Sequence, residues 1–536
     1  MPGSVGARGC DSPGRPDHGC PSDGWRGGPL RERLGGTPEM HDHEKSDRLI
    51  VPANSPNKAG SPAAEAGEGS GLGKENAANK TRPGPRADLS VPSALDRVRE
   101  VASRDKDARF TALLHHVDVD RLREAYRALN PKAAAGVDRV TWEDYGQELE
   151  GNLEDLHARV HRGAYRARPS RRVFIPKADG GQRPLGVAAL EDKILQRAVV
   201  EVLNAIHETD FLGFSYGFRP GRSQHHALDA LATGIMHGKV DWVLDADIRG
   251  FFDAIDHEWL LKFVEHRIAD RRMLRLIRRW LKAGVIEDGE WSDTERGTAQ
   301  GASISPLLAN VYLHYVFDLW AHQWRRRHAR GEVVLVRFAD DYIVGFQYRD
   351  DAVRFLADLR DRFATFGLEL HPDKTRLIEF GRFAAERRQR RGLGKPETFQ
   401  FLGFRHSCSK TRNGRFQLRR VTDARRLRAK LQAVKAEMRR RMHQPIPEQG
   451  EWLASVVRGH CAYYAVPGNI RAVAAFRDQV TRHWYHALRR RGQKPGRLNW
   501  ELMGRLQAAW LPPARIRHPW PEQRFYARIQ ARSPVR

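Results

Sequence analysis

The chain has 536 residues, enough for several domains, and its 92 Lys and Arg outnumber its 66 Asp and Glu, giving a formal net charge of +26. A charge of this size favours a polyanionic partner, either nucleic acid or an anionic membrane surface. No run of about 18 apolar residues could span a bilayer, and no apolar N-terminal core resembles a signal peptide. We therefore expect a nucleic-acid partner and no membrane.

Cysteine usage argues against a zinc-bound or disulfide-linked scaffold. The four cysteines are Cys10, Cys20, Cys408 and Cys461, and no two form the C-x-x-C pair typical of structural zinc sites. Two of them lie in a segment with few large apolar residues, which does not favour a disulfide framework. These features fit a reducing cytosol.

Residues 1–90 are dense in Gly, Pro, Ser and charge, and poor in large apolar side chains. Such a composition buries too little surface to offset chain entropy, so we predict a disordered tail. Its Gly-Leu-Gly-Lys stretch at 71–74 resembles a phosphate-binding loop only weakly. The spacing fails, because Glu68 stands where the first Gly belongs and Glu75 replaces the Ser or Thr.

From about residue 91 the pattern becomes globular, beginning with an amphipathic helix over 91–130. A strand over 171–177 and a return strand over 183–187 flank an Asp-Gly-Gly turn, which predicts a β-hairpin. The hairpin carries Lys177 and Arg183, which either bind an anion or protect a solvated sheet edge. Further helices are expected over 190–206, 256–283, 305–328 and 350–366, with strands near 241–248 and over 332–346.

Beyond residue 410 the sequence predicts mainly helices with a strong positive charge. Apolar residues recur there at three- and four-residue steps, a pattern more typical of core than of a binding site. The Arg-rich opposite faces are where RNA or DNA could lie. The two apolar stripes are Leu427, Leu431, Val434, Met438 and Met442, and Ile470, Val473, Phe476, Val480, Trp484 and Leu488.

Two stretches place acids beside apolar strands. In the predicted strand 242–248, Asp245 and Asp247 share one face, which requires either a cation or a matching Arg or Lys. In 333–346, two apolar runs flank Asp340 and Asp341, which predicts a hairpin with adjacent carboxylates at its tip. Like charges this close call for a cation. Together the acids suggest one site that holds two magnesium ions roughly 4 Å apart and needs no nucleophilic side chain.

Several motifs resemble the reverse transcriptase family. Phe338–Asp341 looks like its Y/F-x-D-D box, and Asp247–His257 like its first palm motif. The loop and helix under the incoming nucleotide, the next palm motif and the primer grip are matched in order by 297–310, 367–375 and 399–404.

Outer features resemble the group II intron-encoded branch, which combines a reverse transcriptase with a maturase. Segments 135–138, 175–186 and 216–223 are similar to its fingers, and Arg458–Tyr464 to its maturase signature. The resemblance covers roughly residues 92–510. Two departures are Ala299, where the family usually has Pro, and Ala302, where it has Gly, and we expect these to affect efficiency and fidelity more than activity.

The resemblance implies a role for each matching residue. Asp247 and Asp340 would be the principal metal ligands, with Asp341 beside them and the Ile248 carbonyl completing one shell. One of Phe251 and Phe252 would stack under the sugar and exclude a 2′-hydroxyl, and the other would be core. Lys374 is either a general acid for pyrophosphate or a surface lysine. The remaining assignments are triphosphate contacts at Lys177 and Arg183, a nucleotide contact at Gln300, a primer grip at Phe401, Leu402 and Gly403, and RNA contacts at Arg489, Arg490 and Arg491.

The resemblance also implies an α+β right-hand polymerase fold. Its parts would be fingers at 91–240, a palm with an antiparallel sheet at 241–409, an α-helical thumb and maturase domain at 410–510, and a short basic tail at 511–536 without an endonuclease module. The implied function is RNA-directed DNA synthesis with two Mg²⁺ ions, together with intron-RNA binding for splicing and mobility, in the bacterial cytosol or nucleoid. Implied partners are intron RNA, an RNA template, a DNA primer and deoxynucleoside triphosphates. A non-catalytic splicing factor with a vestigial palm and a reverse transcriptase recruited to defence are the alternatives.

Overall fold

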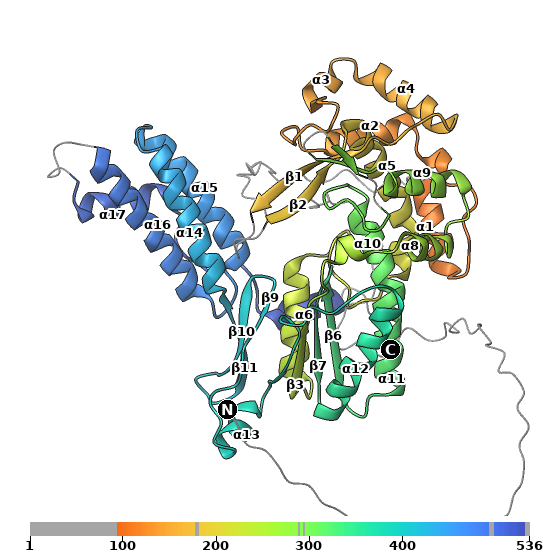
Figure 1. The fold of residues 1–536 in the computed structure, drawn as a ribbon. Coiled ribbons are helices and arrows are strands. Elements are labelled where there is room, and N and C mark those ends of the chain that lie inside the picture. Colours follow the sequence, from red (N-terminus) through yellow and green to blue (C-terminus); the bar gives the residue numbers. More distant parts are fainter. Residues whose placement is uncertain (1–93, 177–181, 288–289, 293–294, 492–497, 531–536) are drawn as a thin grey trace, which may run out of the picture. The chain divides into compact units, whose positions relative to one another are not determined.

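The computed structural model describes residues 94–530 except 177–181, 288–289, 293–294 and 492–497 (Figure 1). It shows the expected mixture of helices and sheets. The predicted disordered tail at 1–90 lies outside the described residues, as do Lys177 and the Asp-Gly-Gly turn of the predicted hairpin.

The predicted single helix over 91–130 is wrong. The segment forms α1 (Ala94–Arg104), a short 3₁₀ turn η1 (Leu114–His116) and α2 (Val119–Ala128). The break is stabilised by Asp270, whose Oδ2 accepts hydrogen bonds from the backbone N–H groups of Leu113 and Leu114 at 2.8 and 3.0 Å. Two further helices follow, α3 (Trp142–Gly146) and α4 (Leu149–His161).

The predicted hairpin is confirmed in both strands. β1 (Ser170–Pro176) pairs antiparallel with β2 (Gln182–Val187), with Ile175 opposite Arg183. β4 (Val285–Glu287) joins β1 in parallel, and β5 (Glu290–Ser292) completes a sheet of order β2-β1-β4-β5. The helices α5 (Leu190–Asp210) and α6 (Gln224–His237) follow in the chain.

A second, fully antiparallel sheet contains the predicted acidic strands. Its strands are β3 (Trp242–Ala246), β6 (Val333–Phe338), β7 (Asp341–Phe346) and β8 (Arg376–Glu379), in the order β6-β7-β3-β8. Both faces of β3 contribute to the core, since Val243 and Leu244 are both fully buried. Helices contribute to this burial, because α6 packs against β6, and α12 (Arg349–Thr365) packs against β3 and β7.

The helices beside this sheet are more segmented than the sequence indicates. The predicted helix 256–283 is two helices, because Asp270 caps the second one by accepting from Arg272 N and Met273 N. The predicted helix 305–328 is continuous but contains a π-helical turn, η2 (His314–Asp318). The elements are α7 (Phe251–Ala254), α8 (His257–Glu265), α9 (Arg271–Leu281), α10 (Ser305–Leu313) and α11 (Leu319–Arg327).

The C-terminal part has a hairpin sheet and a helical bundle with its own apolar core. α13 (Ala384–Arg390) precedes β9 (Phe399–Phe401), β10 (Phe404–Lys410) and β11 (Phe416–Thr422). The bundle comprises α14 (Ala424–Arg440), α15 (Ile446–Tyr464), α16 (Ile470–Arg491) and α17 (Trp500–Trp510). The predicted stripes supply much of its core, including Val434, Met438, Val473, Phe476, Val480 and Trp484.

Where we expected only a short basic tail, the structure has a further helix, α18 (Pro521–Gln530). It packs against α6, Phe525 is buried in the main core, and Arg524 Nε lies 3.2 Å from Asp229 Oδ2. No helix in the described part of the chain has both the length and the apolar character needed to cross a membrane.

Candidate active site

The Asp-Asp pair lies where β6 turns into β7. Phe338 pairs with Asp341, so Ala339 and Asp340 form a two-residue turn, and Ala339 adopts a left-handed backbone with φ of 56°. Ala246 at the end of β3 pairs with Tyr342. Continuing this register by one residue brings Asp247 beside Asp341, so the three predicted acids meet at one end of neighbouring strands.

A buried guanidinium fixes this turn. Arg337 donates to both carboxylate oxygens of Asp318, at 2.7 and 2.5 Å, and both side chains are fully buried. It also donates to the Ala339 carbonyl at 2.9 Å and to Asn310 Oδ1 at 3.1 Å. No motif in the sequence indicated a role for Arg337, although a single charged residue inside an apolar strand was the available signal.

The positive charges near Asp340 and Asp341 do not fully offset the negative charges of the carboxylates. Desolvation by the surrounding protein and the neighbouring carboxylates of Asp340 and Asp247 raise the pKa of Asp341 to about 7, although the Asp341 side chain is exposed to solvent. Burial and Asp247 also raise the pKa of Asp340, although Arg183 and Arg337 oppose the shift. A cluster with this electrostatic character favours an added cation.

The other side of Asp247 already has a cation. Lys374 Nζ lies 2.7 Å from Asp247 Oδ2, and the Asp247 carbonyl accepts a hydrogen bond from His371 N at 2.8 Å. Ile248 is buried and forms an isolated antiparallel bridge with Leu370. Asp245 on β3 is paired with Arg376 at 3.1 Å, so of Asp245 and Asp247 it is the one matched by an arginine.

Among the described residues, no three His, Cys, Asp or Glu side chains lie close enough together to form a metal centre by themselves. The donors at the turn are carboxylates and main-chain carbonyls, the oxygen ligands that hard divalent cations prefer. The donor chemistry and the raised pKa values therefore fit a divalent cation that takes its remaining ligands from elsewhere.

The predicted nucleotide contacts lie on segments that approach the turn. Arg183 is on β2, and its charge opposes the rise in the pKa of Asp340. Gly186 N donates to the Gln300 carbonyl at 2.8 Å, which ties β2 to the loop carrying Gln300. Of the two aromatic candidates, Phe251 is buried and Phe252 is half-buried, with their ring centroids 5.5 Å apart.

Comparison with known proteins identifies the domain that holds these acids. Residues 175–406 match the family model described as "Reverse transcriptase (RNA-dependent DNA polymerase)". Protein YkfC of Escherichia coli (strain K12) is 34% identical over 313 residues, which are 52% of this chain and 81% of that protein. The group II intron-encoded protein LtrA of Lactococcus lactis subsp. cremoris is 35% identical over 222 residues, 41% of this chain and 37% of LtrA.

The chain belongs to the group II intron-encoded reverse transcriptase and maturase family. Nuclear intron maturase 3, mitochondrial, of Arabidopsis thaliana is a more distant relative, 24% identical over 162 residues, 30% of this chain and 21% of that protein. The match therefore covers most of YkfC but less than half of LtrA and of the plant maturase.

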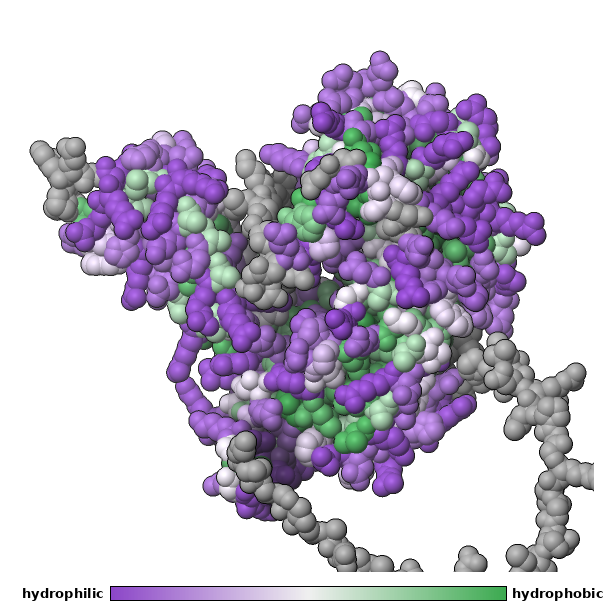
Figure 2. All heavy atoms as spheres, in the orientation of Figure 1, coloured by the Kyte–Doolittle hydropathy of each residue, from purple (hydrophilic) through white to green (hydrophobic). Residues whose placement is uncertain are grey.

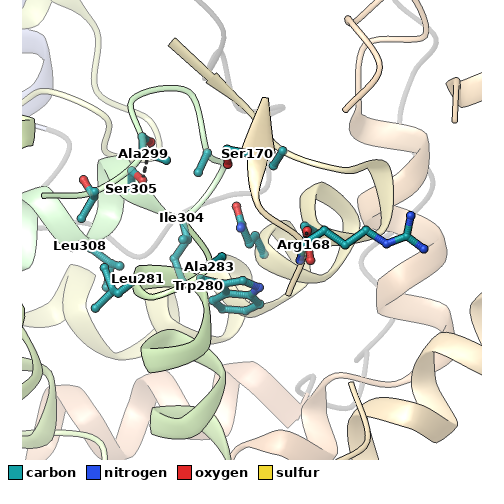
Figure 3. A pocket seen from close by; sticks show the side chains of 14 residues that line it. Arg168, Ser170, Trp280, Leu281, Ala283, Ala299, Ile304, Ser305 and Leu308 are labelled. Carbon is teal, nitrogen blue, oxygen red and sulfur yellow. Dashed lines mark hydrogen bonds between the residues drawn. The ribbon is translucent and has the colours of Figure 1, made fainter. Parts of the chain in front are cut away.

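A small cavity lies beside the loop that precedes α10 in this reverse transcriptase domain (Figure 3). Both residues that depart from the family pattern, Ala299 and Ala302, line it, and Ser305 Oγ donates to the Ala299 carbonyl at 2.9 Å. Its wall includes two buried oxygens, Gln196 Oε1 and Thr298 Oγ1, without a hydrogen-bond partner in the described protein. The otherwise mainly apolar lining therefore includes unsatisfied polar atoms, and its residues come from both α5 and the loop before α10.

The segment predicted as the primer grip is a tight turn held by the C-terminal helices of the reverse transcriptase. Phe401 pairs with Phe404, and the two turn residues have left-handed backbones, with φ of 47° at Leu402 and 76° at Gly403. Tyr463 Oη on α15 donates to the Leu402 carbonyl at 2.9 Å. Neither this contact nor Arg426 of α14, whose charge partly opposes the rise in the pKa of Asp341, was predicted from the sequence.

The predicted RNA contacts lie at the end of α16. Arg489, Arg490 and Arg491 are exposed. The Arg489 guanidinium lies 5.7 Å from the Tyr485 ring centroid, and Arg491 donates to the Gln444 carbonyl at 2.9 Å. Among the described residues none of the three is paired with an acid, so their charges remain available to a polyanion.

Proposed function

We propose that the chain is an RNA-directed DNA polymerase encoded by a group II intron, and that it also binds the intron RNA to assist splicing and mobility. The observation that carries this proposal is the meeting of Asp247 with the Asp340–Asp341 turn at one end of an antiparallel sheet. Membership of the family supports it. The right-hand architecture follows, with fingers at 91–240, a palm at 241–409 and a thumb and maturase domain at 410–510.

Asp247, Asp340 and Asp341 would hold two Mg²⁺ ions, whose remaining ligands would come from the phosphates of the substrate, as is usual for magnesium. Bound there, the ions would lower the pKa of the primer 3′-hydroxyl and stabilise the departing pyrophosphate.

The surrounding side chains would bind and orient the nucleotide. Arg183 would neutralise the triphosphate, since its charge already acts on Asp340. Phe252 would lie under the sugar and exclude a 2′-hydroxyl, because Phe251 is buried in the core. Lys374 would leave Asp247 and donate a proton to pyrophosphate.

The partners of the C-terminal helices would be RNA. The face of the bundle in Figure 2 is mainly hydrophilic, and α14 has an exposed basic surface. Basic side chains on helices neutralise phosphates by binding alone, with no covalent bond made or broken. The exposed cations of α14 are Arg425, Arg426, Arg428, Lys430, Lys435, Arg439 and Arg440.

Primer extension on an RNA template with Mg²⁺ tests the polymerase directly. Asp340→Ala should reduce incorporation on the order of a thousandfold or more, because metal stabilisation of the transition state is worth several kcal/mol. Asp361→Ala is the matched control, since Asp361 is an exposed acid on α12. Equal incorporation by the parent and the Asp340 variant would refute the enzyme proposal.

A non-catalytic splicing factor is the second candidate. The Lys374–Asp247 ion pair favours it, because that pair neutralises one acid without a metal. In that case the parent and both variants would show no extension while binding intron RNA equally. A reverse transcriptase recruited to defence remains a third proposal, and a ribozyme sequence flanking the reading frame would argue against it.

A further inference from the structure

Phe218 has two unusual features. Its φ is 56°, in the left-handed region that bulky residues rarely adopt, and its side chain is 45% exposed. A large aromatic side chain gains little from packing at an exposed position, whereas Gly or Asn would occupy this backbone conformation more easily. Strain of this kind is a recurrent feature of functional sites.

The residues on both sides of Phe218 are fixed, which keeps the strain in place. Gly217 lies so close to the turn formed by Ala339 and Asp340, here called the catalytic turn, that an added Cβ would be 2.2 Å from Ala339 N. The Gly217 carbonyl accepts a hydrogen bond from Asn310 Nδ2 at 2.7 Å. Arg219 is 4% exposed. It donates to the Ser215 carbonyl at 2.9 Å and to the Glu208 carboxylate at 3.0 Å. The protein therefore imposes the conformation of Phe218.

The segment that carries Phe218 runs along the β6 edge of the sheet β6-β7-β3-β8. Ser215 forms a parallel bridge with Arg337 of β6, and Tyr216 N donates to the Arg337 carbonyl at 2.8 Å. The opposite edge is β8, whose Arg376 Nη2 lies 3.4 Å from the Thr398 carbonyl, next to the predicted primer grip. Neighbouring strands of a sheet lie about 4.8 Å apart. The segment that carries Phe218 and the segment around Thr398 therefore lie on either side of the carboxylates.

The exposed ring is free to meet a ligand. Within the described part of the chain, Phe218 forms no ring stacking or cation–π contact, whereas its neighbours Phe214 and Tyr216 each lie under an arginine. Nucleobases stack on exposed aromatic side chains whatever their sequence. An unpartnered ring beside the residues that perform polymerisation is suited to such a contact.

We propose that Phe218 stacks on a base of the template strand next to the catalytic turn. The inference rests on the proposed polymerase function and assigns it a further contact residue. The template strand is chosen because the predicted primer grip lies at the other edge of the sheet, which leaves the β6 edge for the complementary strand.

Binding of a fluorescent RNA template–DNA primer, measured by anisotropy without nucleotide, tests the contact separately from catalysis. Phe218→Ala should weaken binding about 5- to 100-fold, the range for losing one base–aromatic stack. Phe218→Trp should restore it. Phe218→Asn should weaken binding like Ala yet unfold at a temperature at least as high as the parent, because Asn tolerates the left-handed backbone.

The control variant is Phe383→Ala, which removes a comparably exposed ring, 53%, from a residue with an ordinary φ of −104°. It should leave binding unchanged. Equal affinity of Phe218→Ala and the parent would overturn the proposal.

Abasic substrates identify the strand. The loss caused by Phe218→Ala should disappear when the template lacks the base at the catalytic turn. If it disappears only when the primer lacks its terminal base, or persists on both abasic substrates, the assignment to the template is wrong. A parent that binds as expected but extends no primer would refute the polymerase function and leave the stacking contact standing.

Discussion

At the scale of single residues, buried acids show which charges the fold tolerates. Asp318 is fully buried but paired at both oxygens with Arg337, which compensates for lost hydration. Asp192 has weaker compensation, since its carboxylate accepts from the Tyr165 hydroxyl and from Arg168 N at 3.1 Å. Burial raises the pKa of Asp192 to about 6. Asp192 also lines the cavity beside the loop that precedes α10.

The raised pKa of Asp192 predicts a pH-dependent cost to stability. The folded pKa of about 6 exceeds the ordinary value of 3.8, so between these values the folded state binds a proton that the unfolded state does not. Stability therefore falls as pH rises through this window. Asp192→Asn lacks this titration. As the pH rises from 4.5 to 7, the melting temperature of this variant should therefore increase relative to that of the parent, in thermal unfolding followed by circular dichroism. Parallel melting curves across that range would contradict the assignment.

At the scale of elements, the turn between β9 and β10 depends on a helix far along the chain. Leu402 is held in a left-handed backbone while its carbonyl accepts from Tyr463 of α15, and the Gly403 carbonyl accepts from Asp423 N at 3.0 Å. The helix with the maturase-like signature thus positions the predicted primer grip. This connection links the two proposed activities through one hydroxyl group.

Tyr463→Phe removes that hydroxyl alone. We expect KM for template–primer to rise about 2- to 10-fold, the worth of one hydrogen bond, with little change in kcat. Tyr312→Phe is the matched control, because it removes a hydroxyl that donates to the Phe366 carbonyl at 2.7 Å in the core. Steady-state kinetics distinguish the two, and an equal change in KM for both variants would show that Tyr463 acts only through stability.

Local sequence patterns predicted many of the elements but not the contacts between distant segments. The strands around Asp340 follow from apolar runs that flank adjacent acids, and the hairpin of β1 and β2 from its turn residues. The interruption after α1 could not be predicted, because Asp270 stabilises it from 157 residues away. Likewise α18 docks through Arg524 onto Asp229 of α6, a pairing that no helical periodicity reveals. The roles of Arg337 and Tyr463 were missed for the same reason.

At the scale of the whole molecule, the formal charge of +26 is offset in some regions and not in others. Many arginines of the catalytic half are matched by acids, such as Arg376 by Asp245 and Arg387 by Asp241. By contrast, no acid is paired with Arg489, Arg490 or Arg491 in the described part of the structure. The excess charge available to RNA is therefore concentrated on particular surfaces.

This distribution predicts how RNA affinity depends on salt. Affinity should fall steeply and linearly on a logarithmic plot, because each neutralised phosphate releases counterions. Replacing Arg489, Arg490 and Arg491 by Gln should reduce the slope by about 2, at roughly 0.7 per contact for single strands. The same change at Arg271, Arg272 and Arg275, three exposed arginines of α9, controls for total charge. If both triple variants reduce the slope equally, net charge rather than a defined surface at the end of α16 binds the RNA. A flat salt response of the parent would remove the electrostatic basis for RNA binding altogether.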